Sequence, residues 1–558
     1  MTYFFILTPH IENEQAMVTY KQDVKEKSRI EIWTKAIKKL TIDRDNQRIL
    51  KPNYIRRLWD YAFDEMLPNN QPDESIIDSW TIFSNSMYES KQPRQLKIAY
   101  FCGPEPENDL EVMISLGVQI SNVWAIESDK KMYSAALLSA RDKFPTLKIF
   151  NGNISDLIKI TSFKFDIIYL DFTAPLFSKE SKPILTINAI FESNSFSDLG
   201  ILVVNSTLPD KTEENIEFLS SYFRSHAFLE ESIFSGKSKD SRFIEGADVH
   251  GYGDEEVGED EDEDEEYNKT FKHLIESNFE FAYSAFSTNY PTIAASYISP
   301  MLRVGGNTAL KRMFLKMDDK EIQLALEKMV TISDCEISDD NENAADMFSG
   351  GEVFESHEEF PIWNFILRLK DSKSELGKYW YQQFSKNKPS YLYSIQLYDL
   401  LRNAQNYYQS TLSKDVSESI NEIISSLPDK NGGLFCDVPL PHLWIELALN
   451  HLGNAYHVNT DAHWRAKYRA KSRSMYLDLF VFDNCRALYD WLPMINLYGK
   501  DMATIERQII VRACMDAITK QNHYSSFFSY YGANLIGVGT KRWSDFGKLD
   551  ERHDLNVE

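Results

Sequence analysis

The sequence predicts an α/β protein built around a mostly parallel sheet, between about residue 95 and residue 210. From Leu96 onward, short apolar runs of strand length alternate with amphipathic stretches of helix length. This alternation indicates βαβ units, in which the sheet is parallel and the crossovers are right-handed. Small or polar residues follow directly after the apolar runs, where ligands bind in such sheets.

We expect buried strands at KIAYFC, NVWAIE, LKIF, FDIIYLDF and GILVVNS. Continuous apolar runs of this kind are typical of parallel strands that are covered on both faces. Between them, we expect helices at PENDLEVMISLG, SDKKMYSAALLSARDKF and ISDLIKIT.

The regions on either side of the sheet are predicted to be mainly helical. In KEKSRIEIWTKAIKKL, the residues Trp33, Ile37 and Leu40 share one face near helical spacing. NYIRRLWDYAFDEML and ESIIDSWTIFSNSMYES follow similar patterns, and aromatic-rich helical patterns recur after the sheet, as in FKHLIESNFEFAYSAF. Near the end, SMYLDLFVFD alternates as a strand does, so this half is predicted to be mostly α with some β.

A chain of 558 residues is too long for one ordinary core, so we expect several domains. We divide it into a helical N-terminal region (1–92), the sheet domain (93–235), a linker (236–268) and a mainly helical C-terminal recognition or interaction domain (269–558). The linker contains the segment Asp254–Glu266, with eleven acidic residues and no basic one. A stretch this polar cannot bury enough apolar surface to offset the entropy of ordering, so we interpret it as flexible.

The formal net charge is −24, and much of the excess lies in the acidic linker. The overall charge therefore weakens the case for nucleic-acid binding without excluding it. The five cysteines are scattered, with no CxxC pair, so neither a disulfide framework nor a zinc knuckle is predicted. No run approaches the roughly 18 apolar residues of a membrane span, and the N-terminus lacks a basic signal-peptide start. We expect a cytoplasmic protein with no membrane partner.

The carboxyl ends of the expected strands carry the residues that are suited to a ligand. The first strand ends at Cys102 and Gly103, the second at Glu127, and the fourth at Asp171 and Phe172. An acidic residue at the end of the second strand can accept hydrogen bonds from both ribose hydroxyls of an adenosine cofactor. Asn153 and Asp156 follow the third strand, where they could bind a ligand or cap the next helix.

This strand order and these end residues resemble the class I S-adenosylmethionine methyltransferase superfamily, whose fold is Rossmann-like. The resemblance implies that S-adenosylmethionine lies across the strand ends, with Cys102 and Gly103 beside its methionine part and Glu127 holding its ribose. It also implies that Asn153 or Asp156 lies near the adenine. Asp171 and Phe172 would then border the transferring methyl group.

Two segments depart from the family's pattern. The first loop reads GPEPEND, with one glycine where the family usually has two or three. The fourth strand ends in LDFTAP, where enzymes that methylate amines of nucleic acids often carry Asp-Pro-Pro-Tyr. LDFTAP is most similar to the LDP[FY]G[ST]P form of tRNA guanine dimethyltransferases, with Phe172 in place of the first proline, and LVVNSTLPD resembles their following strand.

Two functions therefore compete. The first is an S-adenosylmethionine-dependent methyltransferase with a macromolecular substrate, RNA before DNA before protein, because a small-molecule enzyme rarely needs so large a C-terminal region. The second is a catalytically degenerate scaffold or sensor subunit of a larger bacterial assembly, such as a phage-defence system. The sequence leaves protein partners and the oligomeric state open.

The densest basic run lies in the C-terminal half, interleaved with Trp464 and Tyr468. It consists of Arg465, Lys467, Arg469, Lys471 and Arg473. Basic residues beside aromatic ones can bind single-stranded nucleic acid through phosphate pairing and base stacking. A solvated surface, or a partner for acidic neighbours, is the alternative.

Histidines also gather in this half, at His442, His451, His457 and His463. Their spacing matches no metal signature, so we predict no metal site. No P-loop, HExxH, nucleophile elbow or kinase motif is present in the sequence.

Overall fold

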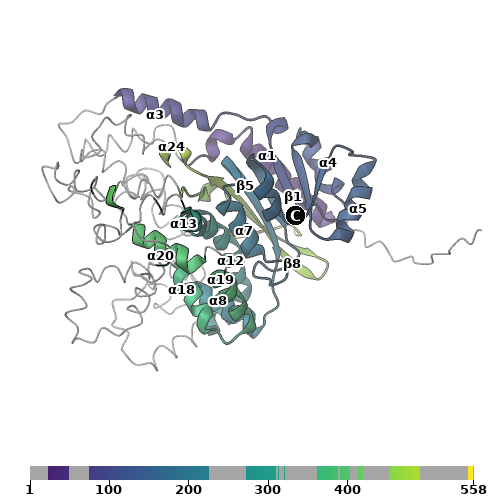
Figure 1. Cartoon of the computed structure of the whole chain (residues 1–558). Coiled ribbons are helices and arrows are strands. Elements are labelled where there is room, and N and C mark those ends of the chain that lie inside the picture. The colour runs from purple at the N-terminus through teal and green to yellow at the C-terminus, as the bar shows by residue number, and fades with distance from the viewer. Residues whose placement is uncertain are drawn as a thin grey trace, which may run out of the picture.

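The computed structural model describes residues 23–49, 74–224, 272–308, 361–386, 390–402, 453–489 and 551–556, with a few single positions between them. A nine-stranded sheet forms its centre, with the order β3-β2-β1-β4-β5-β8-β7-β9 and with β6 beside β8 (Figure 1). The strands are β1 (Ile98–Phe101), β2 (Val123–Glu127), β3 (Lys148–Asn151), β4 (Phe165–Asp171), β5 (Phe196–Thr207), β6 (His457–Val458), β7 (Trp464–Ala470), β8 (Arg473–Asp483) and β9 (His553–Asp554).

The five strands predicted between residues 95 and 210 are all present, and they pair in parallel. β1 lies between β2 and β4, so the sheet grows in one direction through β2 to β3 and in the other through β4 to β5. Together with the flanking helices, this order confirms the predicted Rossmann-like α/β architecture.

Beyond β5, the sheet is completed by a segment from far along the chain. β8 pairs antiparallel with β5 from Leu199↔Asp483 to Thr207↔Met475, and β7 forms a hairpin with β8. This differs from the expected division at residues 235 and 268, because residues 464–483 belong to the same sheet as residues 98–207. Without β8, the long β5 would leave its backbone N–H and C=O groups unpaired along one edge.

Helices cover both faces of the sheet. The described helices are α1 (Asp23–Leu40), α3 (Glu74–Met87), α4 (Glu107–Ser115), α5 (Lys130–Arg141), α6 (Ile154–Ile160), α7 (Pro183–Glu192), α8 (Glu213–Arg224), α12 (Phe279–Ile293), α13 (Ser299–Gly306), α18 (Pro361–Asp371), α19 (Glu375–Lys386), α20 (Tyr391–Arg402) and α24 (Arg486–Tyr489). Buried residues of α1, α4 and α5 belong to the core on one face. Those of α6, α7, α8 and α12 belong to the core on the other face, together with α13 and α18 to α20.

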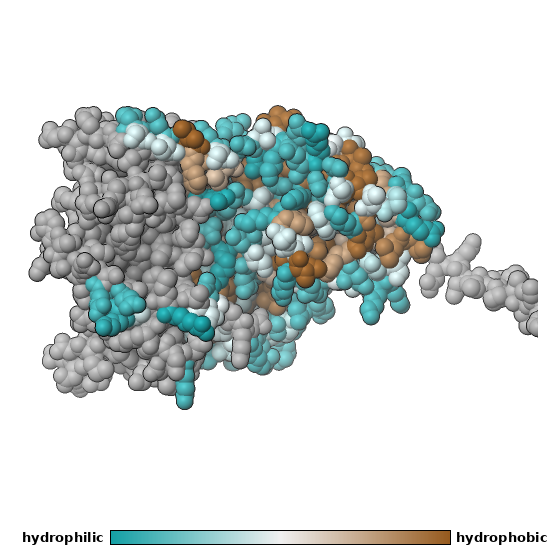
Figure 2. All heavy atoms as spheres, turned by 45° about the horizontal axis from the view of Figure 1, so that its top comes forward, coloured by the Kyte–Doolittle hydropathy of each residue, from teal (hydrophilic) through white to brown (hydrophobic). Residues whose placement is uncertain are grey.

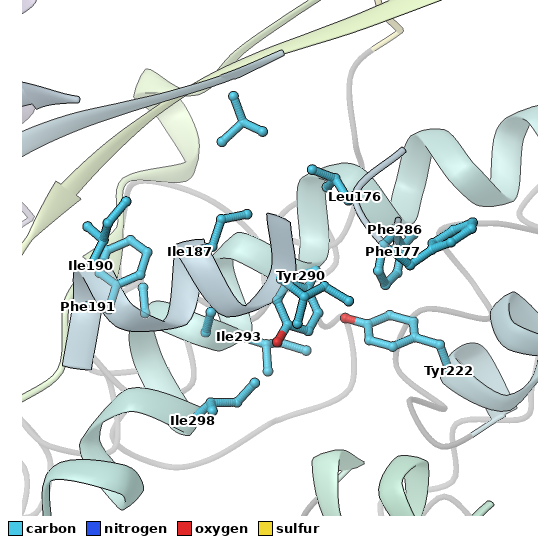
Figure 3. Packing of buried hydrophobic residues seen from close by; sticks show 14 of the residues in the cluster. Leu176, Phe177, Ile187, Ile190, Phe191, Tyr222, Phe286, Tyr290, Ile293 and Ile298 are labelled. Atoms are coloured by element: carbon cyan, nitrogen blue, oxygen red, sulfur yellow. The ribbon is translucent and has the colours of Figure 1, made fainter. Parts of the chain in front are cut away.

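The second core is rich in aromatic side chains and joins distant parts of the chain. Figure 3 shows Ile187 of α7 beside Tyr290 of α12 in this core. The Asn188 amide donates to the Tyr290 hydroxyl at 2.9 Å, and the Trp380 indole donates to the Phe177 carbonyl at 2.9 Å. Of the described helices between residues 272 and 402, α12 contacts β8 of the sheet, whereas α13 packs on α7, and α18 and α19 pack on α8.

The N-terminal helix confirms the predicted pattern. α1 buries Ile32, Trp33, Ala36, Ile37 and Leu40 on one face. It also carries acidic residues in its first turn and lysines in its last turn, which suits the helix dipole. The expected helix NYIRRLWDYAFDEML and the acidic segment Asp254–Glu266 lie outside the described residues.

The surface of the described part is mixed. Figure 2 shows apolar groups in small patches among hydrophilic ones on one face of the molecule. The large apolar residues that are exposed lie on several different elements, among them Ile42, Ile82 and Ile160. Within the part of the chain that is described, no helix has the length and apolar character needed to cross a membrane.

Candidate functional site

The strand order changes direction between β1 and β4, at whose carboxyl ends open α/β sheets have their topological switch point. The helix after β1, α4, packs on one face of the sheet, and the helix after β4, α7, packs on the other. The connections that leave these two neighbouring strands therefore separate, which is where open α/β sheets bind their ligands.

The strand register aligns the predicted site residues in one row. Phe101 pairs with Ile126, and Tyr100 pairs with Tyr169, so Cys102 lies level with Glu127 on one side and Asp171 on the other. Glu127 in turn pairs with Asn151. The structure thus brings Cys102, Glu127 and Asp171 together at one edge of the sheet.

The first loop leaves space beside its glycine. Gly103 has a φ of +58°, and a Cβ placed on it would meet no atom within 4 Å. Pro106 is buried at the start of α4, where its carbonyl accepts a hydrogen bond from the Tyr100 hydroxyl at 2.8 Å. The Pro106 ring therefore packs at the start of the helix, and the side of Gly103 where a Cβ would point stays open.

Glu127 ends β2, and its carboxylate is held by the backbone of the loop that follows. Its Oε1 accepts a hydrogen bond from the backbone N–H of Asp129 at 2.8 Å. Asp129 in turn caps α5 by accepting from the N–H groups of Lys131 and Met132, both at 2.9 Å. Burial, followed by the nearby Glu127 carboxylate, raises the pKa of the Cys102 thiol to about 12. Cys102 is therefore a neutral packing residue at neutral pH, and Glu127 provides the negative charge at these two strand ends.

The tip of β3 is the most exposed part of the row. Asn153 occupies the capping position of α6 but makes no side-chain capping bond, and both Asn153 and Asp156 are exposed. Gly152 has a φ of +154°, and a Cβ there would lie 2.9 Å from the Phe150 ring. Its N–H donates to the Glu127 carbonyl at 3.0 Å, which ties the ends of β2 and β3 together.

Asp171 is held by residues that the sequence did not single out. Its Oδ1 accepts a hydrogen bond from the Asn205 amide at 2.7 Å, and the same amide donates to the Tyr468 hydroxyl at 2.7 Å. Asn205 is 1% exposed, and its Oδ1 has no hydrogen-bond partner among the described residues. Phe172 is buried against Phe101 with ring centroids 5.5 Å apart, so it packs in the core beneath the site.

Helix α1 adds a cation beside Asp171. Arg29 Nε lies 3.4 Å from Asp109 Oδ2, and the Trp33 indole donates to Asp109 Oδ1 at 2.8 Å. Burial acts to lower the pKa of Arg29, but Asp109, Tyr169 and Asp171 outweigh it and raise that pKa. Arg29 therefore lies within electrostatic range of the Asp171 carboxylate and links α1 to the start of α4.

The basic run of the sequence is divided between the interior and the surface of the protein. Arg465 is buried, and its guanidinium donates to the Ser284 carbonyl at 3.0 Å and lies 3.6 Å from Asp478. Lys467, Arg469, Lys471 and Arg473 are exposed. Trp464 and Tyr468 lie against α1, on the face of β7 opposite Lys467 and Arg469.

The histidines do not form a metal site in the described residues, where no group of three or more potential ligands occurs. Burial lowers the pKa of His457 to about 3, and His463 Nε2 lies 3.1 Å from Asp478 Oδ1. His442 and His451 lie outside the described residues.

Comparisons with known proteins give little beyond this geometry. No protein-family model matches the chain, and no curated protein matches it significantly. Among solved structures, it matches the crystal structure of an S-adenosylmethionine-dependent methyltransferase from Clostridium acetobutylicum ATCC 824. The two are 16% identical, with a TM-score of 0.17, and the match covers 27% of this chain and 56% of that chain.

Proposed function

We propose that this chain binds S-adenosylmethionine at the carboxyl edge of its sheet and transfers the methyl group to a macromolecular substrate. One observation supports this most strongly. Near the point where the strand order reverses, an open glycine of positive φ follows β1, one residue beyond the position that lies level with the carboxylate at the end of β2.

The residues present fit the cofactor. The open side of Gly103 would let the methionine part approach the backbone, and the Glu127 carboxylate would accept the ribose hydroxyls. Asn153 and Asp156 are exposed beyond β3 and would contact the adenine. Cys102 would line the floor of the site as a neutral, buried side chain.

Asp171 would orient the acceptor group of the substrate. The cofactor, when bound, supplies an activated methyl group that is transferred by direct displacement. This chemistry depends mainly on holding two reacting atoms in line. Asn205 and Tyr468 fix the Asp171 carboxylate, and Arg29 provides a positive charge beside it. Phe172 would act through packing beneath Asp171, because its ring is buried.

Titration calorimetry with S-adenosylmethionine and S-adenosylhomocysteine tests the proposal. We expect micromolar binding to the wild-type chain and no detectable heat for Glu127→Ala, which removes the carboxylate that would hold the ribose. Asp129→Ala is the matched control, because it removes the α5 cap, worth about 1 kcal/mol, without removing that carboxylate. It should lower the melting temperature and leave the cofactor affinity within about twofold.

The scaffold or sensor alternative is favoured by the first loop, which satisfies its own polar groups. Glu105 accepts hydrogen bonds from Asn108, and Pro106 accepts one from Tyr100, so these groups are not available to a ligand. If neither cofactor form gives heat or thermal protection to the wild-type chain, this alternative replaces the methyltransferase proposal.

A further inference from the structure

The β7–β8 hairpin lies at the same edge of the sheet as the proposed active site. Thr207, at the end of β5, pairs with Met475, and the Leu208 N–H donates to the Ser474 carbonyl at 2.9 Å. Arg473 Nη1 donates to the Thr173 carbonyl at 3.2 Å. Thr173 is two residues after Asp171, so Arg473 touches the segment that leads out of the site.

The exposed cations of this hairpin lie on both of its faces, because Arg473 pairs with Ala470 and therefore projects from the face opposite Lys467 and Arg469. We call this set of cations the basic hairpin. It comprises Lys467, Arg469, Lys471 and Arg473. Lys467 and Arg469 are two residues apart on β7, so they project from the same face of the strand. Lys471 lies in the turn with a φ of +57°.

Two acidic side chains that the structure describes near the basic hairpin are already engaged with other groups. Asp554 of β9 pairs in register with Lys467 and also accepts a hydrogen bond from the Asn556 N–H at 3.0 Å. Glu280 accepts a hydrogen bond from the Tyr476 hydroxyl at 2.7 Å. From Trp464 to Ser474 the sequence has five basic residues and no acidic one. The surface therefore favours an anionic partner.

The base of the hairpin is held by hydrogen bonds from several other elements. Beneath the exposed cations, Asp478 Oδ2 accepts a hydrogen bond from Arg552 at 2.8 Å, and Asp478 Oδ1 accepts one from Thr288 at 2.7 Å. The Arg469 N–H donates to Asn556 Oδ1 at 2.7 Å. A surface built on such a base loses little conformational freedom when it binds a partner.

We propose that the basic hairpin binds the phosphate backbone of a nucleic-acid strand and guides it to Asp171. Arginine and lysine side chains neutralise phosphates and release counterions, which is the main source of affinity in such contacts. Base stacking on Trp464 or Tyr468 plays no part, because both rings pack against α1. This inference rests on the proposed function and names its substrate class.

Fluorescence anisotropy with a labelled single-stranded RNA of mixed sequence, measured from 50 to 300 mM salt, tests the inference. We expect Arg469→Glu with Lys471→Glu to weaken binding by about tenfold or more. Four phosphate contacts predict a slope of log affinity against log salt of about −2.8, and the loss of two contacts reduces it to about −1.4. Both substitutions leave the Arg473–Thr173 bond in place.

Lys370→Glu with Lys378→Glu is the matched control, because it changes the net charge equally on α18 and α19, away from the hairpin. This control should keep the wild-type affinity and slope. The inference would be overturned if the Arg469/Lys471 variant bound the RNA with the wild-type affinity and salt slope. It would also be overturned if the wild-type chain bound neither the RNA nor a DNA strand of the same sequence. Cofactor titration of the same samples reports separately on the proposed function. The substituted residues lie on β7 and in the hairpin turn, whereas Glu127 lies at the end of β2.

Discussion

The two halves of the carboxyl edge are held together in different ways. At the ends of β2 and β3, the side-chain bonds are local, as between Glu127 and the N–H two residues later. At the ends of β4, β5 and β7, Asn205 joins Asp171, 34 positions away, to Tyr468, 263 positions away. The first half leaves surface for a small ligand, and the second half fixes the side chains that would act on a substrate.

The same contrast continues beneath the basic hairpin. Burial alone would raise the pKa of Asp478, but Arg552, His463 and Arg465 outweigh it and hold that pKa below its usual range. Asp478 is therefore a buried anion surrounded by donors from β7, α12 and the segment 551–556. This network stabilises the half of the sheet that is completed from the distant part of the chain.

The largest effect is expected where this network loses a cation. Arg552→Ala should destabilise the chain by about 3–5 kcal/mol, because it leaves the Asp478 carboxylate buried with less compensation. Denaturant unfolding measures the change. Arg141→Ala, on the exposed surface of α5, should leave the curve unchanged. If both variants lost a comparable free energy of unfolding, the Asp478 network would not be what stabilises this half of the sheet.

Repeating the comparison at acid pH tests whether Arg552 stabilises the charged form of Asp478. Because the pKa of Asp478 is lowered in the fold, its contribution to stability is complete above about pH 4 and is lost as the pH falls below that value. The wild-type melting temperature should therefore fall more steeply below pH 4 than that of Arg552→Ala. If the melting temperatures of the two proteins fell equally steeply below pH 4, Arg552 would not stabilise the ionised form of Asp478.

A smaller effect is expected when the support of Asp171 is removed. Asn205→Leu should reduce methyl incorporation from labelled S-adenosylmethionine into total RNA by about a hundredfold, because a misplaced group loses alignment. Cofactor affinity should change by less than about twofold. Asn188→Leu is the matched control, since Asn188 is equally buried but bonds Tyr290 and Tyr391 in the core. If both variants lose activity alike, Asn205 has only a structural role.

The smallest effect concerns the other buried aspartate of β8. Burial raises the pKa of Asp483 to about 6, although it accepts hydrogen bonds from Ile49, Cys485 and Tyr88. The folded chain then binds more protons than the unfolded chain between about pH 4 and pH 6, so the stability falls as the pH rises through this window.

Asp483→Asn should flatten that pH dependence, which thermal melts at half-unit pH intervals would show. The exposed Asp142→Asn should retain the wild-type slope. An unchanged slope in Asp483→Asn would mean that another group titrates in this window.

The sequence predicted the parallel strands because each is covered on both faces and therefore reads as a continuous apolar run. It also predicted that Glu127 and Asp171 share an edge, since the carboxyl ends of parallel strands lie together. For β8, the alternation in SMYLDLFVFD indicated a strand. No local pattern indicates that its partner is β5, because that pairing is decided by which edge is left open.

The supporting side chains could not be predicted for a related reason. Arg29 lies within electrostatic range of Asp171 because α1 packs on the sheet, with Trp33 against Tyr169. The alternation in WRAKYRA does place the cations and the aromatic rings of β7 on opposite faces. It does not show that Ser284 and Asp478 hold Arg465 in the interior, because both come from other elements.

The late arrival of β8 has a consequence for synthesis in the cell. Ribosomes add about 5–20 residues per second, so making Leu208 to Ser472 takes roughly 13–53 s. Throughout that time, the apolar GILVV segment of β5 remains an unpaired sheet edge, which can pair with other chains and cause aggregation. A fragment that stops at residue 235 would keep that edge permanently, so soluble expression should require the chain at least through Asp483.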